Sequence, residues 1–141
     1  MSVTVHATTV TIGDRAVLLM GESGAGKSDL ALRLIDRGAR LVSDDYTRLD
    51  DEGGVLVARS PATIAGKLEI RGIGIVAVPH EAQACVALAV RLGAEERMPE
   101  PATLVLAGVA VPQVTIDPRA PSAPIKIEWM MERGMTERWT A

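Results

Sequence analysis

The chain has 141 residues, 48% of them hydrophobic, 23% charged, and a formal net charge of -3 at pH 7. This length and apolar content predict a single domain over residues 1–141, and the lack of a basic cluster argues against nucleic acid as a partner. No apolar run approaches the ~20 residues of a membrane span and no signal-peptide pattern opens the chain, so we expect a cytoplasmic protein that binds no membrane.

The first part of the chain reads as a β-hairpin that leads into a glycine-rich loop and a short helix. Residues 3–12 are rich in β-branched side chains, Gly13-Asp14 supplies a turn, and an apolar run follows up to Met20. Residues 27–37 carry apolar side chains at helical spacing, and Gly38 gives a C-terminal stop. The segment therefore predicts a strand–loop–helix unit.

Strands dominate the rest of the prediction. We expect strands over residues 40–43, 46–49, 55–59, 84–92 and 103–116, and a strand interrupted by two glycines over 68–78. A terminal helix is expected over 125–139, with Ile127, Met130 and Met131 on one side. The single cysteine, Cys85, falls in an apolar run and is expected to pack as a small buried side chain.

The loop GESGAGKS fits the pattern G-x-x-x-x-G-K-[ST] at every position. In such loops glycines let backbone N–H groups turn toward phosphate oxygens, the lysine places a charge on the transferred group, and the hydroxyl binds Mg²⁺. The expected phosphate-binding residues are Gly21, Glu22, Ser23, Gly24, Ala25, Gly26, Lys27 and Ser28. The loop by itself does not separate a kinase from a switch or a motor.

Acidic residues follow the next expected strand. Asp44 and Asp45 come 17 and 18 residues after Lys27, a path short enough to bring them to the same crevice. One carboxylate could assist Mg²⁺ while the other accepts the proton of an attacking hydroxyl, as phosphoryl transfer requires. Without the phosphate loop nearby, the same pair would be typical of a solvated turn.

Three further polar residues are candidates. Glu69 and Arg71 are two apart on a strand pattern and share a face, which suits a metal ligand beside a phosphate clamp. An ordinary surface ion pair would show the same spacing. His6 and Arg97, taken alone, are typical of a polar strand face and a charged loop.

The combination of GESGAGKSDLALRLIDRGARLVSDD and LEIRGIGIV resembles the HPr kinase/phosphorylase family, specifically its C-terminal catalytic domain. The resemblance implies an α/β P-loop domain of the HPr kinase / PEP carboxykinase-like type, a strand-rich mixed sheet with few helices. It also implies a Mg²⁺-ATP-dependent protein serine kinase that acts on an HPr-like phosphocarrier of the phosphotransferase system and so regulates carbohydrate metabolism. Many members also remove that phosphate by phosphorolysis, and the family forms hexamers.

The family's functional positions fall on matching residues of this chain. The catalytic histidine corresponds to His6, the proton acceptor to Asp45 with Asp44 in support, and the metal-binding glutamate to Glu69. The catalytic arginine corresponds loosely to Arg97. With Arg71 added from its spacing to Glu69, the candidate catalytic set is Asp45, Lys27, His6, Arg97, Asp44 and Arg71, and the implied metal ligands are Ser28 and Glu69.

The main departure from the family pattern follows residue 116. Members have a P-V-[KR]-x-G-R type loop there that is tied to dephosphorylation, whereas this chain reads DPRAPS with only Arg119 at a basic position. The reverse reaction, the oligomeric state and the effectors therefore stay open. Two other functions of the phosphate loop also stay open, namely those of a small-molecule kinase and of an ATP-dependent regulatory binding module.

Overall fold

The computed structural model describes residues 1–61 and 64–133. The strands, in chain order, are β1 (Ser2–Val5), β2 (Ala7–Ile12), β3 (Arg15–Met20), β4 (Arg40–Ser43), β5 (Thr47–Glu52), β6 (Val55–Arg59), β7 (Lys67–Ile70), β8 (Gly74–Ala77), β9 (Gln83–Leu92), β10 (Ala102–Leu106) and β11 (Val109–Ile116). The helices are α1 (Lys27–Asp36) and α2 (Ala123–Arg133). This composition confirms the expected strand-rich α/β class with few helices.

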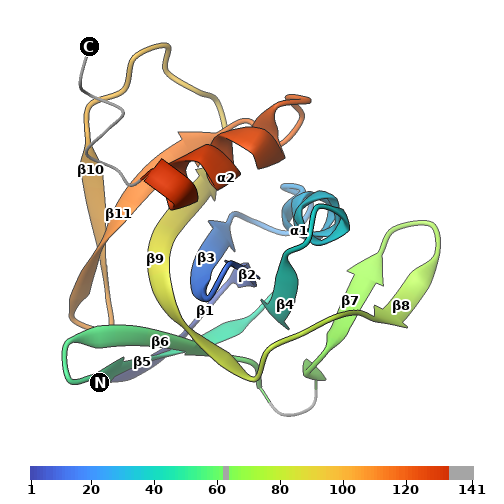
Figure 1. Ribbon diagram of the computed structural model, residues 1–141, viewed down its shortest axis with the longest axis horizontal. Helices are drawn as coiled ribbons and strands as arrows, with labels where there is room; N and C mark the ends of the chain where they lie inside the picture. Colours follow the sequence, from blue (N-terminus) through green and yellow to red (C-terminus); the bar gives the residue numbers. More distant parts are fainter. Residues whose placement is uncertain (62–63, 134–141) are drawn as a thin grey trace.

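One large mixed sheet organises the molecule (Figure 1). Its strands follow the order β1-β5-β6-β9-β3-β2-β4, and β11 joins at β9 with β10 on its outer side. The pairs β3–β9 and β9–β11 are parallel, whereas the other pairs are antiparallel. β9 is long enough to pair with β6 near its start and with β11 near its end.

The parallel strands decide where a ligand can bind. Because β3, β9 and β11 run in the same direction, they all end at one edge of the sheet, at Met20, Leu92 and Ile116. The glycine-rich loop leaves β3 at this edge, and two further loops leave β9 and β11 beside it. Ligands of open α/β sheets bind at the carboxyl ends of the strands, so this edge is the expected site.

β3 lies in the middle of the sheet and is buried on both faces, which explains its continuous apolar run. Successive side chains of a strand point to opposite faces. Val17 and Leu19 accordingly join the cluster that α1 and α2 cover, with Leu34 and Ile127 among its members. Ala16 and Leu18 join the cluster on the opposite face.

Two expected strands are each divided in the structure. The segment 3–12 breaks at His6, so that β1 pairs with β5 while β2 pairs with β3 and β4. The segment 103–116 turns back at Ala107 and Gly108, which have φ of 51° and 82°. Two successive positive φ values are the geometry of a tight hairpin turn. The sequence did not indicate the turn, because alanine stands where Asn, Asp or Gly is usual.

The glycine-interrupted segment 68–78 forms a hairpin of its own. β7 and β8 pair with each other and form a separate two-stranded sheet, which Figure 1 shows apart from the main sheet. The turn residues include Gly72, with φ of 86°, and Gly74 follows with φ of 127°. The glycines therefore serve the reversal of the chain.

Two smaller expectations have different outcomes. Cys85 is exposed, so the prediction of a buried thiol is wrong. It lies at the start of β9, ahead of the residues that the two helices cover. The terminal helix is present as α2, with Ile127 and Met131 buried, and the part of the prediction over residues 134–139 lies outside the described residues.

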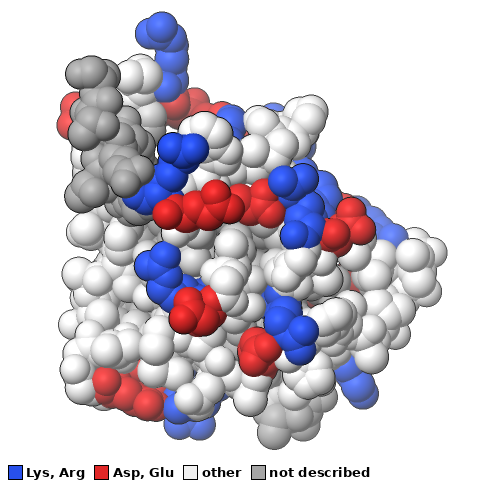
Figure 2. All heavy atoms as spheres, in the orientation of Figure 1, with Lys and Arg blue, Asp and Glu red and all other residues white. Residues whose placement is uncertain are grey.

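Charges of both signs are interspersed on the molecular face in Figure 2, with uncharged surface between them. Within residues 1–61 and 64–133, no helix is long and apolar enough to cross a membrane.

Asp50 on β5 links three strands and gives the first prediction. A hydrogen bond from the Ser2 side chain, with further bonds from Arg48 and Arg59, holds the pKa of Asp50 below its ordinary value. Since the pKa is lower in the folded state, the stabilisation is present above about pH 4 and is lost as the pH falls through the folded-state value. Asp50→Asn is expected to lower the free energy of unfolding at neutral pH, measured by urea titration.

The same experiment at low pH checks the cause. The difference between Asp50→Asn and the unsubstituted protein should shrink below about pH 4, because protonation already removes the charge there. Asp14→Asn, a change of the same kind in the exposed β2–β3 turn, serves as the control. An Asp50→Asn deficit that is constant with pH would contradict the electrostatic explanation.

Candidate functional site

The glycine-rich loop joins β3 to α1 and can adopt its path only with glycine at specific positions. Gly24 and Gly26 have φ of 86° and 102°, where side chains are strained. A Cβ atom on Gly21 would lie 2.8 Å from the Cβ of Ala25. The helix begins at Lys27, directly after Gly26, so its N-terminal N–H groups adjoin the loop. This geometry suits a phosphate group.

Lys27 lies inside the loop. Lys27 is 5% exposed, and its Nζ donates hydrogen bonds to the carbonyl oxygens of Gly21 and Glu22 at 2.8 and 3.0 Å. The same Nζ is 3.8 Å from Oδ1 of Asp45. A buried ammonium group held by backbone carbonyls keeps its positive charge at a fixed place beside the loop.

Asp44 connects the loop helix to the neighbouring elements. Its Oδ1 accepts hydrogen bonds from Ser28 Oγ at 2.6 Å and from Thr8 Oγ1 at 3.0 Å, and its Oδ2 accepts one from the Glu69 backbone N–H at 3.0 Å. The residue is 8% exposed. Buried polar groups in folded proteins are almost always hydrogen-bonded. With three such bonds, the Asp44 carboxylate holds the parts of the site together.

Asp45 has a conformation that separates it from Asp44. Its φ is 68°, in the left-handed region that few residues other than glycine, Asn and Asp adopt. Its backbone N–H donates to Thr8 Oγ1 at 3.0 Å, and its Oδ1 lies 2.7 Å from Nε2 of His6. The side chain is 50% exposed, so the carboxylate can meet a ligand from solvent.

His6 and Tyr46 lie next to Asp45 and contact each other. Their rings are stacked, with centroids 5.0 Å apart and an interplanar angle of 16°. His6 is brought to the site because β1 and β2 part at this residue, and Tyr46 follows Asp45 directly. The stacking restricts the imidazole, whose Nε2 faces Asp45.

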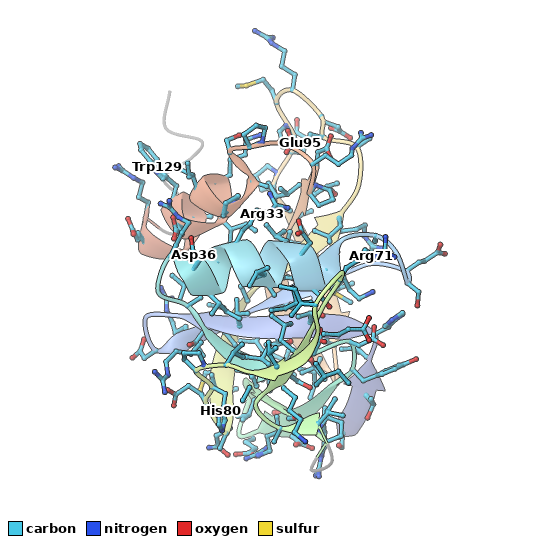
Figure 3. All side chains as sticks on the ribbon, turned by 90° about the vertical axis from the view of Figure 1, so that its right-hand side faces the viewer. Arg33, Asp36, Arg71, His80, Glu95 and Trp129 are labelled. Carbon is cyan, nitrogen blue, oxygen red and sulfur yellow. The ribbon has the colours of Figure 1, made fainter. Side chains whose placement is uncertain are left out.

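A cavity of about 580 Å³ brings most of the expected residues together. Its walls combine residues of the glycine-rich loop and α1 with Asp44 and Asp45, and with Glu69 and Arg71 from the hairpin. β7 ends at Ile70, so Arg71 belongs to the turn of the hairpin and does not share a strand with Glu69. Figure 3 shows Arg71 beside the end of α1 where the helix begins.

The donor set fits a phosphate-bound magnesium ion. Mg²⁺ in phosphoryl-transfer sites takes one or two carboxylates and completes its coordination with water and phosphate oxygens. Ser28 and Glu69 both line the cavity, and Asp44 joins the two residues through its hydrogen bonds to the Ser28 hydroxyl and the Glu69 backbone N–H. Within the described residues no cluster of three His, Cys, Asp or Glu side chains could hold a metal alone. Phosphate oxygens would therefore have to complete the coordination.

Some residues differ from the sequence interpretation in their placement. Arg97 lies exposed in the loop between β9 and β10 and does not line the cavity. Thr8 and Tyr46 belong to the site as well, but the sequence interpretation did not identify them. Thr8 is two residues from His6, and alternation along an extended chain points both side chains to one side, so this spacing could have indicated it. Tyr46 is the chain's one tyrosine, but nothing in the sequence signals its stacking on His6.

Comparison with known proteins gives concordant matches. Residues 1–84 match the family model described as the HPr Serine kinase C-terminal domain. The HPr kinase/phosphorylase of Clostridium beijerinckii is 48% identical over 73 residues, which cover 52% of this chain and 24% of that protein. For the HPr kinase/phosphorylase of Clostridium acetobutylicum the identity is 48% over 75 residues, covering 53% and 25%. The chain thus spans about a quarter of the length of these curated relatives.

A solved structure matches over almost the entire chain. The Hpr(Ser) kinase/phosphatase from Coxiella burnetii superposes with a TM-score of 0.82 at 32% sequence identity. The match covers 96% of this chain and 97% of that one. The similarity therefore includes the C-terminal strands and α2, which lie beyond the residues that the family model matches.

Thr8 supplies the prediction of this subsection. Its hydroxyl donates to Asp44 and accepts from the Asp45 N–H, so Thr8→Val keeps the shape and removes both bonds. Because a carboxylate and an amide lose their partner, we expect a destabilisation of about 1–3 kcal/mol, measured by urea unfolding. Thr4→Val, on the exposed side of β1, is the matched control, and equal stability of the two variants would contradict the role of Thr8.

Proposed function

Because the chain belongs to the HPr serine kinase C-terminal domain family, we propose that it is a Mg²⁺-ATP-dependent protein serine kinase whose substrate is an HPr-like phosphocarrier protein. The observation that carries the proposal is the position of Asp45. Its carboxylate lies within 2.7 Å of His6 and 3.8 Å of Lys27, on the wall of the cavity that the phosphate loop also lines. The similarity to proteins named HPr kinase/phosphorylase supports the choice of substrate.

Asp45 is the proposed proton acceptor. Its exposed, left-handed position presents a carboxylate that can accept the proton of a serine hydroxyl as the oxygen attacks the terminal phosphate of ATP. His6 orients this carboxylate through the bond to Oδ1. Lys27 holds a fixed positive charge 3.8 Å from the same oxygen, where negative charge must be stabilised during transfer.

Ser28 and Glu69 are the proposed ligands of Mg²⁺. The bound ion would neutralise charge on the phosphate oxygens. Asp44 keeps the Ser28 hydroxyl and the Glu69 backbone in place, and Arg71 adds a positive charge to the cavity wall from the hairpin. Binding and transfer would then depend on α1, β4 and the β7–β8 hairpin together.

A transfer assay tests the proposal. The protein is incubated with labelled ATP, Mg²⁺ and a purified HPr-like protein, and the label is located by mass spectrometry. We expect it on a serine of the carrier. Label on a metabolite would support a small-molecule kinase, and tight ATP binding with no transfer would support a regulatory binding module.

Two substitutions separate binding from chemistry. Lys27→Ala should abolish turnover because it removes the charge of the phosphate loop. Asp45→Asn should leave the Kd for ATP nearly unchanged while kcat falls by about 10²–10⁴-fold, the usual worth of a general base. Binding is measured by titration calorimetry and kcat by the transfer assay.

Asp51→Asn is the matched control for these variants, because Asp51 is an exposed residue of β5 that does not line the cavity. It should keep the full rate. An Asp45→Asn protein with kcat near that of the unsubstituted protein would show that Asp45 is not the proton acceptor.

Incubation of the phosphorylated carrier with inorganic phosphate tests the reverse reaction in the same preparation. The loop that departs from the family pattern ties its Arg119 side chain to Asp117. An arginine engaged in this way is less available to a phosphate ion. We therefore expect phosphorolysis to be slower than the forward transfer.

A further inference from the structure

Tyr46 stands next to the proposed proton acceptor, and its side chain is half exposed. A ring that stays this exposed buries little apolar surface, so core packing does not account for its position. Its stacking partner is His6, whose Nε2 lies 2.7 Å from Oδ1 of Asp45. We propose that Tyr46 is a positioning residue, whose ring holds the His6 imidazole in the direction that aims the Asp45 carboxylate at the attacking hydroxyl. The inference rests on the proposed kinase function and deepens it.

The register of β1 and β5 brings the two rings together. In this antiparallel pair Val5 lies opposite Thr47, so the next position along places His6 opposite Tyr46. Side chains of directly opposed residues share a face and contact each other. His6 itself belongs to neither neighbouring strand, because β1 ends at Val5 and β2 begins at Ala7. The direction of the imidazole therefore depends on its side-chain contacts.

The backbone of Tyr46 closes the turn that carries Asp45. Its N–H donates to the carbonyl oxygen of Asp44 at 2.8 Å, across a single residue. This hydrogen bond between residues two apart defines a γ-turn, and the φ of 68° at Asp45 belongs to the rare and strained form of that turn. The Ser43 hydroxyl donates to the Tyr46 carbonyl oxygen and holds the far side of the turn. The aromatic residue and the acidic residue are thus parts of one compact unit.

The stacked imidazole can direct the carboxylate through a hydrogen bond of fixed geometry. An ionised carboxylate only accepts hydrogen bonds, so Nε2 of His6 donates to Oδ1 of Asp45. With Oδ1 engaged in this way, Oδ2 is the oxygen that takes the proton of the serine. The ring centroids are 5.0 Å apart and the planes differ by 16°, so the Tyr46 ring limits the tilt of the imidazole. Without that ring the imidazole is free to rotate and no longer holds the carboxylate in one direction.

Two substitutions at Tyr46 test the role of the ring. Tyr46→Leu removes the aromatic face and keeps an apolar side chain, whereas Tyr46→Phe retains the face. In the transfer assay we expect Tyr46→Leu to lower kcat about tenfold, with the KM for the carrier and the Kd for ATP changed by less than about twofold. Tyr46→Phe should retain most of kcat, because stacking does not use the hydroxyl. Trp129→Leu, the same kind of change at an exposed aromatic residue of α2, is the matched control and should keep the full rate.

A double-mutant cycle identifies the residue through which Tyr46 acts. His6→Ala removes the stacking partner, so adding Tyr46→Leu to it should change kcat by less than about twofold. A separate structural role of Tyr46 would lower kcat equally in both backgrounds. A rise in KM at unchanged kcat would instead identify Tyr46 as a contact of the carrier. Either of these results overturns the inference, as does full activity of Tyr46→Leu.

Nuclear magnetic resonance of the ligand-free protein gives a second test that needs no substrate. The chain has two histidines, and His80, which lies beside Gly66 and does not line the cavity, is the internal reference. In a neutral imidazole the signals of the two ring nitrogens are well separated while a hydrogen bond holds one tautomer, and they approach each other when the tautomers exchange. We expect the separation for His6 to shrink in Tyr46→Leu and to persist in Tyr46→Phe.

The two tests separate this inference from the proposed function. Unchanged His6 signals in Tyr46→Leu would overturn the positioning role. If the unsubstituted protein transfers no phosphate to an HPr-like protein, the proposed substrate is wrong, and the His6 signals still decide whether Tyr46 holds the imidazole.

Discussion

The site depends on the hydrogen bonds that converge on the buried carboxylate of Asp44. They come from three separate elements, through Thr8 of β2, Ser28 of α1 and the backbone of Glu69 in β7. Leaving a buried carboxylate without partners costs several kcal/mol, so these bonds favour this mutual arrangement of the three elements. The same bonds that satisfy Asp44 therefore set the distance between the phosphate loop and the hairpin.

The left-handed turn at Asp45 follows from this arrangement. Asp44 is buried and bonded to its three donors, whereas the side chain of the next residue, Asp45, is 50% exposed. The Thr8 hydroxyl bridges both residues, because it donates to the Asp44 carboxylate and accepts from the Asp45 N–H. Such a strained residue is often found where a reactive group is held ready. Here the left-handed conformation places the Asp45 carboxylate next to His6 and Lys27.

Local signals made the strand–loop–helix unit and the acidic pair predictable. The pattern of GESGAGKS requires glycines at fixed positions, and the structure has positive φ at Gly24 and Gly26. The division of strands at His6 and Ala107 was not predictable, because it depends on which distant strands pair. The stacking of Tyr46 on His6 depends on the same long-range pairing, since β1 is held by β5.

The sheet topology explains how a small fold gathers several loops at one site. An antiparallel sheet would send the loops of neighbouring strands to opposite edges, but β3, β9 and β11 are parallel and place three loops together. Asp44 and Asp45, which follow β4, and the β7–β8 hairpin line the first cavity, and the loops after β9 and β11 line a second cavity beside the glycine-rich loop. The glycine-rich loop lies between these two groups of residues, so the loop after β11 can change in sequence while Asp44 and Asp45 stay in place.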